Sequence, residues 1–142
     1  MTGNIHEMGA KAYGAARRTQ TPLRIIVELY DSVLCAVAHA KAACLQDDFE
    51  GEFNAIIAAT KILQGLDGAL NQTDPKARPI AEMLHDYYKT TIVQLHRAKQ
   101  AKSPESELRY GSVQRQVLAM REAFAAIAGV PSLVVEAAEK SA

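Results

Sequence analysis

The chain has 142 residues, the length of a single domain. Hydrophobic residues make up 49% and charged residues 23%, which favours a folded globular protein over a disordered one. Sixteen basic residues balance sixteen acidic ones, so no overall charge attracts nucleic acid, and we expect no nucleic-acid partner. No apolar run approaches the ~18 residues of a membrane span, and residues 1–20 contain no secretory signal. We therefore expect a cytoplasmic protein without membrane insertion.

Four long helices are predicted from the spacing of apolar residues, with prolines at their boundaries. They cover Pro22 to Gln46, Phe49 to Leu70, Ile80 to Ala101 and Pro104 to Ala128. Thr21 and Ser103 are the expected N-caps of the first and the last helix. Asp48 or Asp47 caps the second helix, and Gly129 ends the last. Because the connections are short, neighbouring helices are expected to be antiparallel, which gives an all-α, up-down four-helix bundle.

The two ends of the chain fall outside the predicted bundle, which occupies residues 21–129. Residues 1–20 hold three of the eight glycines and only scattered apolar residues, so we predict a flexible N-terminal arm. Residues 130–142 are expected to form a C-terminal tail or a short fifth helix.

The first predicted helix has more apolar surface than one bundle interface needs. Each of the other three helices has one apolar stripe, and these stripes include Phe49, Phe53, Ile80, Leu84, Tyr110, Val113 and Ile127. The first helix has two stripes, which contain Leu23, Ile26 and Tyr30 in one and Ile25, Leu29, Val33 and Ala36 in the other. Two interpretations remain open. Either this helix is central and touches several neighbours (or the arm covers it), or its second stripe receives a helix of another protein.

Motifs for metal binding or group transfer are sparse. Glu82 and His85 form one Glu-x-x-His motif, which is only half of the set that di-iron bundles use, so we expect no metal site. His96 and Lys99 form the H-x-x-K pattern of histidine phosphotransfer bundles, in which an exposed imidazole accepts a phosphoryl group. A histidine phosphotransfer or other signalling bundle is therefore the alternative function.

The two cysteines give no sign of catalysis. Cys35 and Cys44 fall on one predicted helix about 13 Å apart along its axis, too far for a disulfide bond. We interpret both as small buried hydrophobic residues. With no nucleophile motif and no phosphate-binding loop, we expect no catalytic residue and no enzyme.

A series of short motifs runs through most of the chain in a fixed order. The series comprises Ala12-Tyr13, Thr21-Pro22, Leu29-Tyr30-Asp31, Ala40-Lys41, Asp48-Phe49, Ile62 with Leu66 and Leu70, Ile80-Ala81 through Leu84-Tyr87-Tyr88, Leu95 with Ala98, and Arg121 with Ala123-Phe124. In order and spacing these motifs resemble the flagellin-specific export chaperones, the FliS family, over roughly residues 12–127. Phe124 stands where the family usually has tryptophan.

The resemblance implies a non-enzymatic chaperone that folds as an antiparallel helical bundle and needs no cofactor, nucleotide or metal. Such chaperones bind the C-terminal helical region of flagellin in the cytosol, prevent its premature polymerisation and aid its delivery to the flagellar type III export gate. Flagellin is thus the expected partner, and the export gate is a second candidate. In the family the N-terminal arm can occupy part of the binding groove when flagellin is absent.

We place the predicted flagellin-binding groove on the second stripe of the first helix and on the third helix. Its residues are Ile25, Leu29, Val33, Ala36, Tyr88 and Ile92. The arm residues Ile5, Met8 and Tyr13 are predicted to cap the empty groove, because covering apolar surface protects a protein from aggregation.

Overall fold

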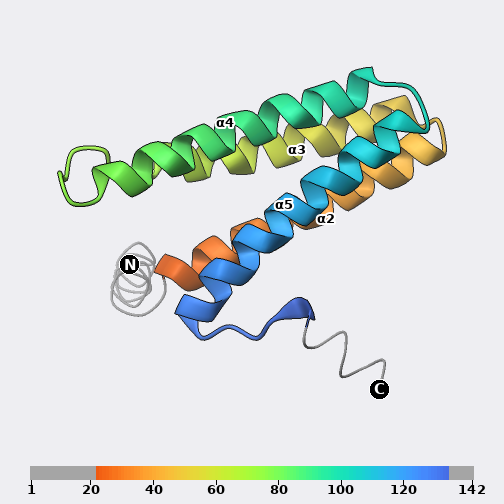
Figure 1. Ribbon diagram of the computed structural model, residues 1–142. Helices are drawn as coiled ribbons and strands as arrows, with labels where there is room; N and C mark the ends of the chain where they lie inside the picture. Colours follow the sequence, from red (N-terminus) through yellow and green to blue (C-terminus); the bar gives the residue numbers. More distant parts are fainter. Residues whose placement is uncertain (1–21, 135–142) are drawn as a thin grey trace, which may run out of the picture. The chain divides into compact units, whose positions relative to one another are not determined.

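The computed structural model describes residues 22–134 and contains four α-helices (Figure 1). They are α2 (Pro22–Leu45), α3 (Phe49–Gly68), α4 (Arg78–Gln100) and α5 (Glu105–Ala128). No strand occurs within residues 22–134. The all-α prediction is therefore confirmed. None of the helices in this range has the length and apolar character needed to cross a membrane.

The turn between α2 and α3 is specified by two consecutive aspartates. Asp47 has φ 56°, a left-handed conformation that aspartate tolerates better than most residues, and it ends α2. Asp48 is the N-cap of α3, since its Oδ1 accepts a hydrogen bond of 3.0 Å from the amide of Gly51. A Cβ atom at position 51 would clash with the Asp48 carboxylate, so glycine leaves room for the cap. Of the two predicted caps, Asp48 is the one the structure uses.

Two other helix starts differ slightly from the prediction. Helix α4 begins at Arg78 instead of Ile80, because Pro79 lies in its first turn, where a missing N–H removes no helical hydrogen bond. Helix α5 begins at Glu105, and Ser103 bonds through its hydroxyl to the Glu107 carboxylate. The predicted cap Thr21 and the predicted arm at 1–20 lie outside the described residues.

The described chain divides into two compact units, and continuous helices pass from one to the other. Unit 2 is Leu29–Ala119, and unit 1 contains residues 22–28 and 120–134 of the described range. The domain boundaries predicted from the sequence, with a bundle over 21–129 and a tail over 130–142, remain predictions.

Unit 2 has an antiparallel arrangement of its four helical segments. Helices α3 and α4 lie side by side (Figure 1). The start of α3 meets the end of α4, where the Lys99 ammonium lies 4.7 Å from the centre of the Phe53 ring. The end of α2 meets the start of α5, where Cys44 Sγ and Ser106 Oγ are 3.2 Å apart. The helices therefore run up, down, up and down, as predicted.

The core of unit 2 contains two polar links between helices that are not neighbours in the chain. The hydroxyls of Tyr30 on α2 and Tyr88 on α4 are 2.7 Å apart, and both side chains are buried. The Tyr110 hydroxyl on α5 donates a hydrogen bond of 2.5 Å to Glu52 Oε2 on α3. Aliphatic residues surround these links, chiefly Val33, Val37, Ile56, Leu63, Leu95, Val113 and Val117.

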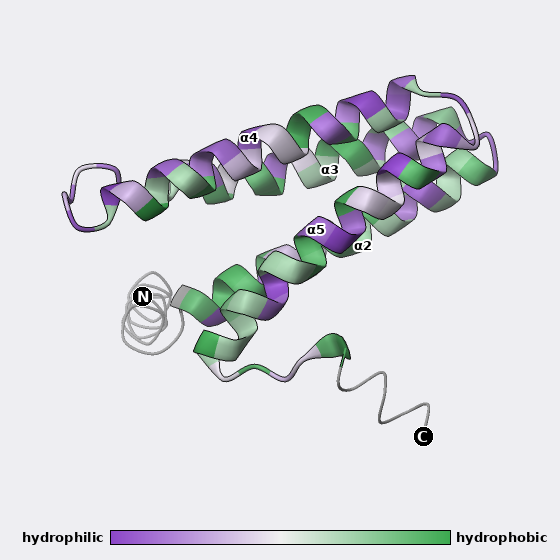
Figure 2. Cartoon of the chain, viewed as in Figure 1, coloured by the Kyte–Doolittle hydropathy of each residue, from purple (hydrophilic) through white to green (hydrophobic). Residues whose placement is uncertain are grey.

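Several residues assigned to apolar stripes are exposed, because the stripes extend past the region that neighbouring helices cover. Phe49 is 74% exposed, Ile80 60% and Ile127 71%, and Phe53 is also exposed. These stripe residues therefore lie outside the buried core. Figure 2 shows hydrophilic residues along much of the visible face of α4, with hydrophobic ones recurring between them.

In unit 1, hydrogen bonds from side chains of α5 fix the segment that follows this helix. Gly129 has φ 72° and ends the helix, as predicted. Arg121 is almost fully buried, and its Nη1 donates to the carbonyl oxygen of Pro131 at 2.8 Å. Glu122 Oε1 accepts from the amides of Leu133 and Val134. The predicted fifth helix falls largely on residues 135–142, outside the described residues.

Candidate functional site

The six residues of the predicted groove differ in exposure. On α2, Val33 is fully buried, whereas Ile25, Leu29 and Ala36 are half-buried. On α4, Tyr88 is buried and Ile92, one turn further along, is half-buried. Ile25 belongs to unit 1 and the other five residues belong to unit 2.

Helices α2 and α4 meet beside the predicted groove through the Tyr30–Tyr88 pair, whose ring centres are 6.4 Å apart. Leu29 precedes Tyr30 in the chain, and Ile92 follows Tyr88 by four residues, so both lie close to this contact along their helices. Within unit 2, Val33 and Tyr88 are buried, whereas Leu29, Ala36 and Ile92 keep accessible surface. The predicted capping residues Ile5, Met8 and Tyr13 lie outside the described residues.

A second surface on α2 was not identified from the sequence. We define the uncharged face of α2 as Cys35, Ala38, Ala42 and Leu45, which share one side of the helix and are all exposed. Exposed helix faces normally have charged side chains. The sequence feature that indicates this face is the stretch from Ser32 to Gln46, in which Lys41 is the only residue with a permanent charge. An exposed helix face that is free of charge can contact an apolar partner helix.

The tyrosines beside the predicted groove stay protonated at physiological pH. Burial raises the pKa of Tyr30 and Tyr88, and the hydrogen bond to Tyr88 raises that of Tyr30 further. Burial also raises the pKa of Tyr87 to about 12. The Tyr87 hydroxyl donates to the carbonyl oxygen of Gln116 on α5. These phenols act as neutral hydrogen-bonding groups that fix α4 against its neighbours.

The histidine motifs form no centre of chemistry among the described residues. His85 Nδ1 lies 2.7 Å from Asp67 Oδ1, which joins the first half of α4 to the end of α3, while Glu82 is exposed. No group of three or more potential metal ligands occurs within the described range. His96 and Lys99 are exposed, and the Lys99 ammonium lies over the Phe53 ring.

The two cysteines occupy different environments. Cys35 is exposed on the uncharged face of α2, so the expectation that it is buried is wrong. Cys44 is half-buried, and burial is the main cause that raises the pKa of its thiol, with Glu52 adding to the shift. Its hydrogen-bonding neighbour is Ser106. A thiol with a raised pKa is a weak nucleophile at neutral pH.

The comparison with known families favours an export chaperone over a phosphotransfer bundle. The family model of flagellar protein FliS matches residues 9–131. The chain belongs to this family. No curated protein matches the chain significantly.

The FliS match includes all four helices and most of both units. It identifies the chain in general terms as a flagellar export chaperone, a class of binding proteins that function in flagellar biogenesis. The Lys99 ammonium lies over the Phe53 ring, a position that adds nothing in favour of phosphotransfer. The accessible apolar surfaces of α2 are therefore the candidate site.

Proposed function

We propose that the protein is a cytosolic chaperone that binds the C-terminal helical region of flagellin, prevents its premature polymerisation and aids its delivery to the flagellar export gate. Membership in the FliS family supports the general role. The observation that carries the specific proposal is the accessible, charge-free surface of α2. This surface is the uncharged face; the half-buried groove residues Leu29 and Ala36 lie on the other side of α2 and form a separate accessible apolar surface.

The chemistry of this surface suits an amphipathic helix. A polymerisation helix of flagellin presents an apolar stripe, and a surface without charge covers such a stripe without desolvating an ion. The small side chains of Cys35, Ala38 and Ala42 let a helix approach closely, and Leu45 offers apolar contact at one end. Because ordering a disordered client costs about 2–5 kcal/mol or more, a long contact surface is required. The predicted set of Ile25, Leu29, Val33, Ala36, Tyr88 and Ile92 remains the proposed groove.

The first experiment mixes the purified protein with monomeric flagellin from the same organism and measures binding by calorimetry and light scattering. We expect a one-to-one complex that is lost when about 40 residues, enough for one or two helices, are removed from the flagellin C-terminus. A folded, helical sample that fails to bind intact flagellin would refute the proposal.

A matched pair of variants locates the contact on the chaperone. Ala38 and Ala119 are both exposed helical alanines, on α2 and α5, so glutamate at either position costs little helix stability. We expect Ala38→Glu to weaken flagellin binding at least tenfold and Ala119→Glu to change it less than twofold. Leu29→Asp tests the groove itself, with Leu108→Asp, at a 70% exposed leucine of α5, as the control. Equal effects of the two members of either pair would place the contact elsewhere.

A further inference from the structure

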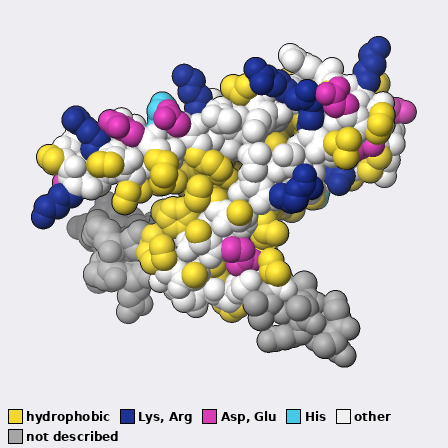
Figure 3. Space-filling model, in the orientation of Figure 1, with side chains coloured by type: hydrophobic (Ala, Val, Ile, Leu, Met, Phe, Trp, Pro, Cys, Tyr) yellow, Lys and Arg dark blue, Asp and Glu magenta, His cyan; other side chains and the backbone are white. Residues whose placement is uncertain are grey.

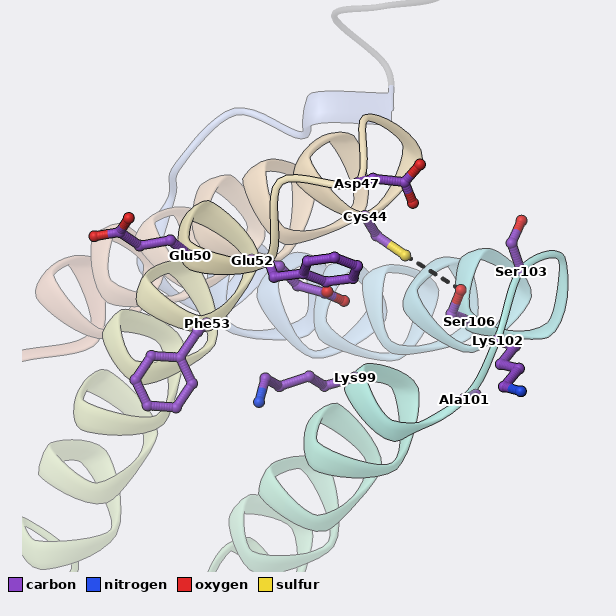
Figure 4. Close-up of a pocket in the computed structure, with 11 residues that line it drawn as sticks. Cys44, Asp47, Glu50, Glu52, Phe53, Lys99, Ala101, Lys102, Ser103 and Ser106 are labelled. Carbon is purple, nitrogen blue, oxygen red and sulfur yellow. Dashed lines mark hydrogen bonds between the residues drawn. The ribbon is translucent and has the colours of Figure 1, made fainter.

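A pocket of about 670 Å³ opens at the end of unit 2 where the α2–α3 turn and the α4–α5 connection lie (Figure 4). All four helices contribute to its lining, which includes Cys44, Glu52, Phe53, Lys99 and Ser106. Its volume is in the range of sites that hold a side chain or a small ligand. The flagellin-binding proposal makes no use of this pocket.

The mouth of the pocket has exposed aromatic surface. Phe49 is 74% exposed and Phe53 48%, and both line the pocket. Two further exposed residues at this end of unit 2 are Leu45 and Leu108. Clustered large hydrophobic side chains that remain exposed are typical of a protein-binding surface. The phenylalanines offer ring faces on which a planar cation can stack.

This end of unit 2 is acidic, although the whole chain is neutral. Segments 44–53 and 99–109 contain six carboxylate side chains but only three basic ones. Arg109 pairs with Glu105 at 2.9 Å, and Lys99 is held over the Phe53 ring. Figure 3 shows acidic, basic and hydrophobic side chains next to one another at this end of the molecule, at its upper right. The excess of carboxylates favours a basic partner over an acidic one.

Glu52 provides a buried acceptor at the pocket wall. Only 4% of its surface is exposed, and its Oε2 accepts a hydrogen bond from Tyr110. No basic side chain within the described range forms an ion pair with it. In a low-dielectric site a cation interacts with a carboxylate far more strongly than in water. Glu52 is thus placed to bind a cationic group that enters the pocket.

We propose that this pocket is a second docking site, which receives an arginine side chain, flanked by apolar residues, from a partner protein. The guanidinium stacks on the Phe53 ring and donates to Glu52, and the flanking residues cover Phe49. A planar guanidinium suits both contacts better than a compact ammonium does. In the unbound protein the Lys99 ammonium takes the position over the ring, and the arriving arginine displaces it (Figure 4).

The proposal goes beyond flagellin binding, because the pocket lies at the end of α2, whereas the predicted groove begins near its start. The groove and the pocket share no residue, and of the uncharged face only Leu45 lies at this end of unit 2, so the chaperone can hold its client in the groove while a second protein binds the pocket. Failure of one proposal leaves the other intact.

The test uses a peptide probe, acetyl-Leu-Arg-Leu-amide, titrated into the full-length ¹⁵N-labelled protein and followed by amide chemical shifts. The matched probes carry glutamate or norleucine in place of arginine. We expect the arginine peptide to shift amides of segments 44–53 and 99–109, and to bind at least tenfold more tightly than the glutamate peptide. Binding of the glutamate peptide as tightly as the arginine peptide, or shifts confined to other segments, would overturn the proposal.

Two variants are expected to change the affinity in opposite directions. Glu52→Gln keeps an acceptor for Tyr110 but removes the charge, so it weakens binding of the arginine peptide about tenfold. The control Glu82→Gln, on an exposed part of α4, changes this affinity less than twofold. Lys99→Gln frees the Phe53 ring and strengthens binding about threefold. If Glu52→Gln fails to fold, the exposed Lys99→Gln variant decides, and weaker binding of the arginine peptide to that variant would refute the displacement of Lys99.

Discussion

The tyrosines of unit 2 make the stability of the fold sensitive to alkaline pH. Burial raises the pKa of Tyr30, Tyr88 and Tyr110, and raises that of Tyr87 to about 12. In the unfolded chain each phenol ionises near pH ~10. Above that pH the unfolded state binds fewer protons than the folded state. The stabilisation from these raised pKa values is therefore fully present below pH ~10 and is lost progressively above it.

The size of the effect follows from the four groups. At about pH 11 each of Tyr30, Tyr87 and Tyr110 has lowered the free energy of unfolding by about 1.4 kcal/mol, and the three together by about 4 kcal/mol, to which Tyr88 adds. This loss is comparable to the total stability of a small domain, so we expect the protein to unfold near pH ~11. For Tyr87 the loss ends near pH 12, its folded-state pKa.

Denaturant unfolding followed by circular dichroism, at several values between about pH 8 and about pH 11, measures this loss. A Tyr110→Phe variant has one buried phenol fewer, so between these limits its stability falls about 1.4 kcal/mol less than that of the unmodified protein. Phenolate absorbance is recorded in parallel. Ionisation of all four phenols near pH ~10 with the helical signal intact would refute the reasoning.

Four further predictions concern single residues. At neutral pH, Tyr110→Phe lowers the free energy of unfolding by about 1.5–3 kcal/mol, because buried Glu52 loses its phenol donor; a loss below about 0.5 kcal/mol in urea unfolding would contradict this. Asp48→Ala removes the N-cap of α3 and costs about 1 kcal/mol, measured in the same way. Gly129→Ala puts a side chain on a residue with φ 72° and costs about 1–2 kcal/mol, visible as a lower melting temperature. His96→Gln leaves flagellin binding in calorimetry unchanged within twofold, because this imidazole lies outside the proposed groove.

The ends of the helices were largely predictable because local chemistry sets them. The paired aspartates at the α2–α3 turn and Gly129 after α5 act through their own backbone and their nearest neighbours in the chain. The sequence predicts a start of α4 two residues too late, because Pro79 lies inside the first helical turn and not before it. Proline is accepted in the first helical turn, so it marks a start to within only a few residues.

Apolar spacing predicts which side of a helix is apolar but not how much of it a neighbour covers. Phe49 and Ile80 follow helical spacing yet are exposed near helix starts, whereas Val33, placed in the predicted groove, is fully buried. The excess apolar surface of α2 divides into a buried and an accessible part, and binding of a partner helix to the accessible part remains a prediction. Some of it packs in the core of unit 2, and some of it, including Leu29 and Ala36, remains accessible.

The pocket could not be predicted from the sequence either, because it depends on how the helices pack against one another. In the sequence Glu52 is an acidic residue in the first turn of a helix, which is a common surface position. Its burial depends on Tyr110, 58 residues away, and on the register in which α3 and α5 meet. Neither spacing nor composition specifies that register.

The contrast between the two thiols gives the chaperone a built-in reporter site. Cys35 is exposed on the uncharged face of α2, while Cys44 is half-buried and its thiol has a raised pKa. A maleimide dye at limiting concentration and neutral pH therefore labels Cys35 preferentially, without any engineered cysteine. Because that position lies on the proposed client-binding surface, the dye's fluorescence would follow client arrival and release in real time on an otherwise unmodified chain.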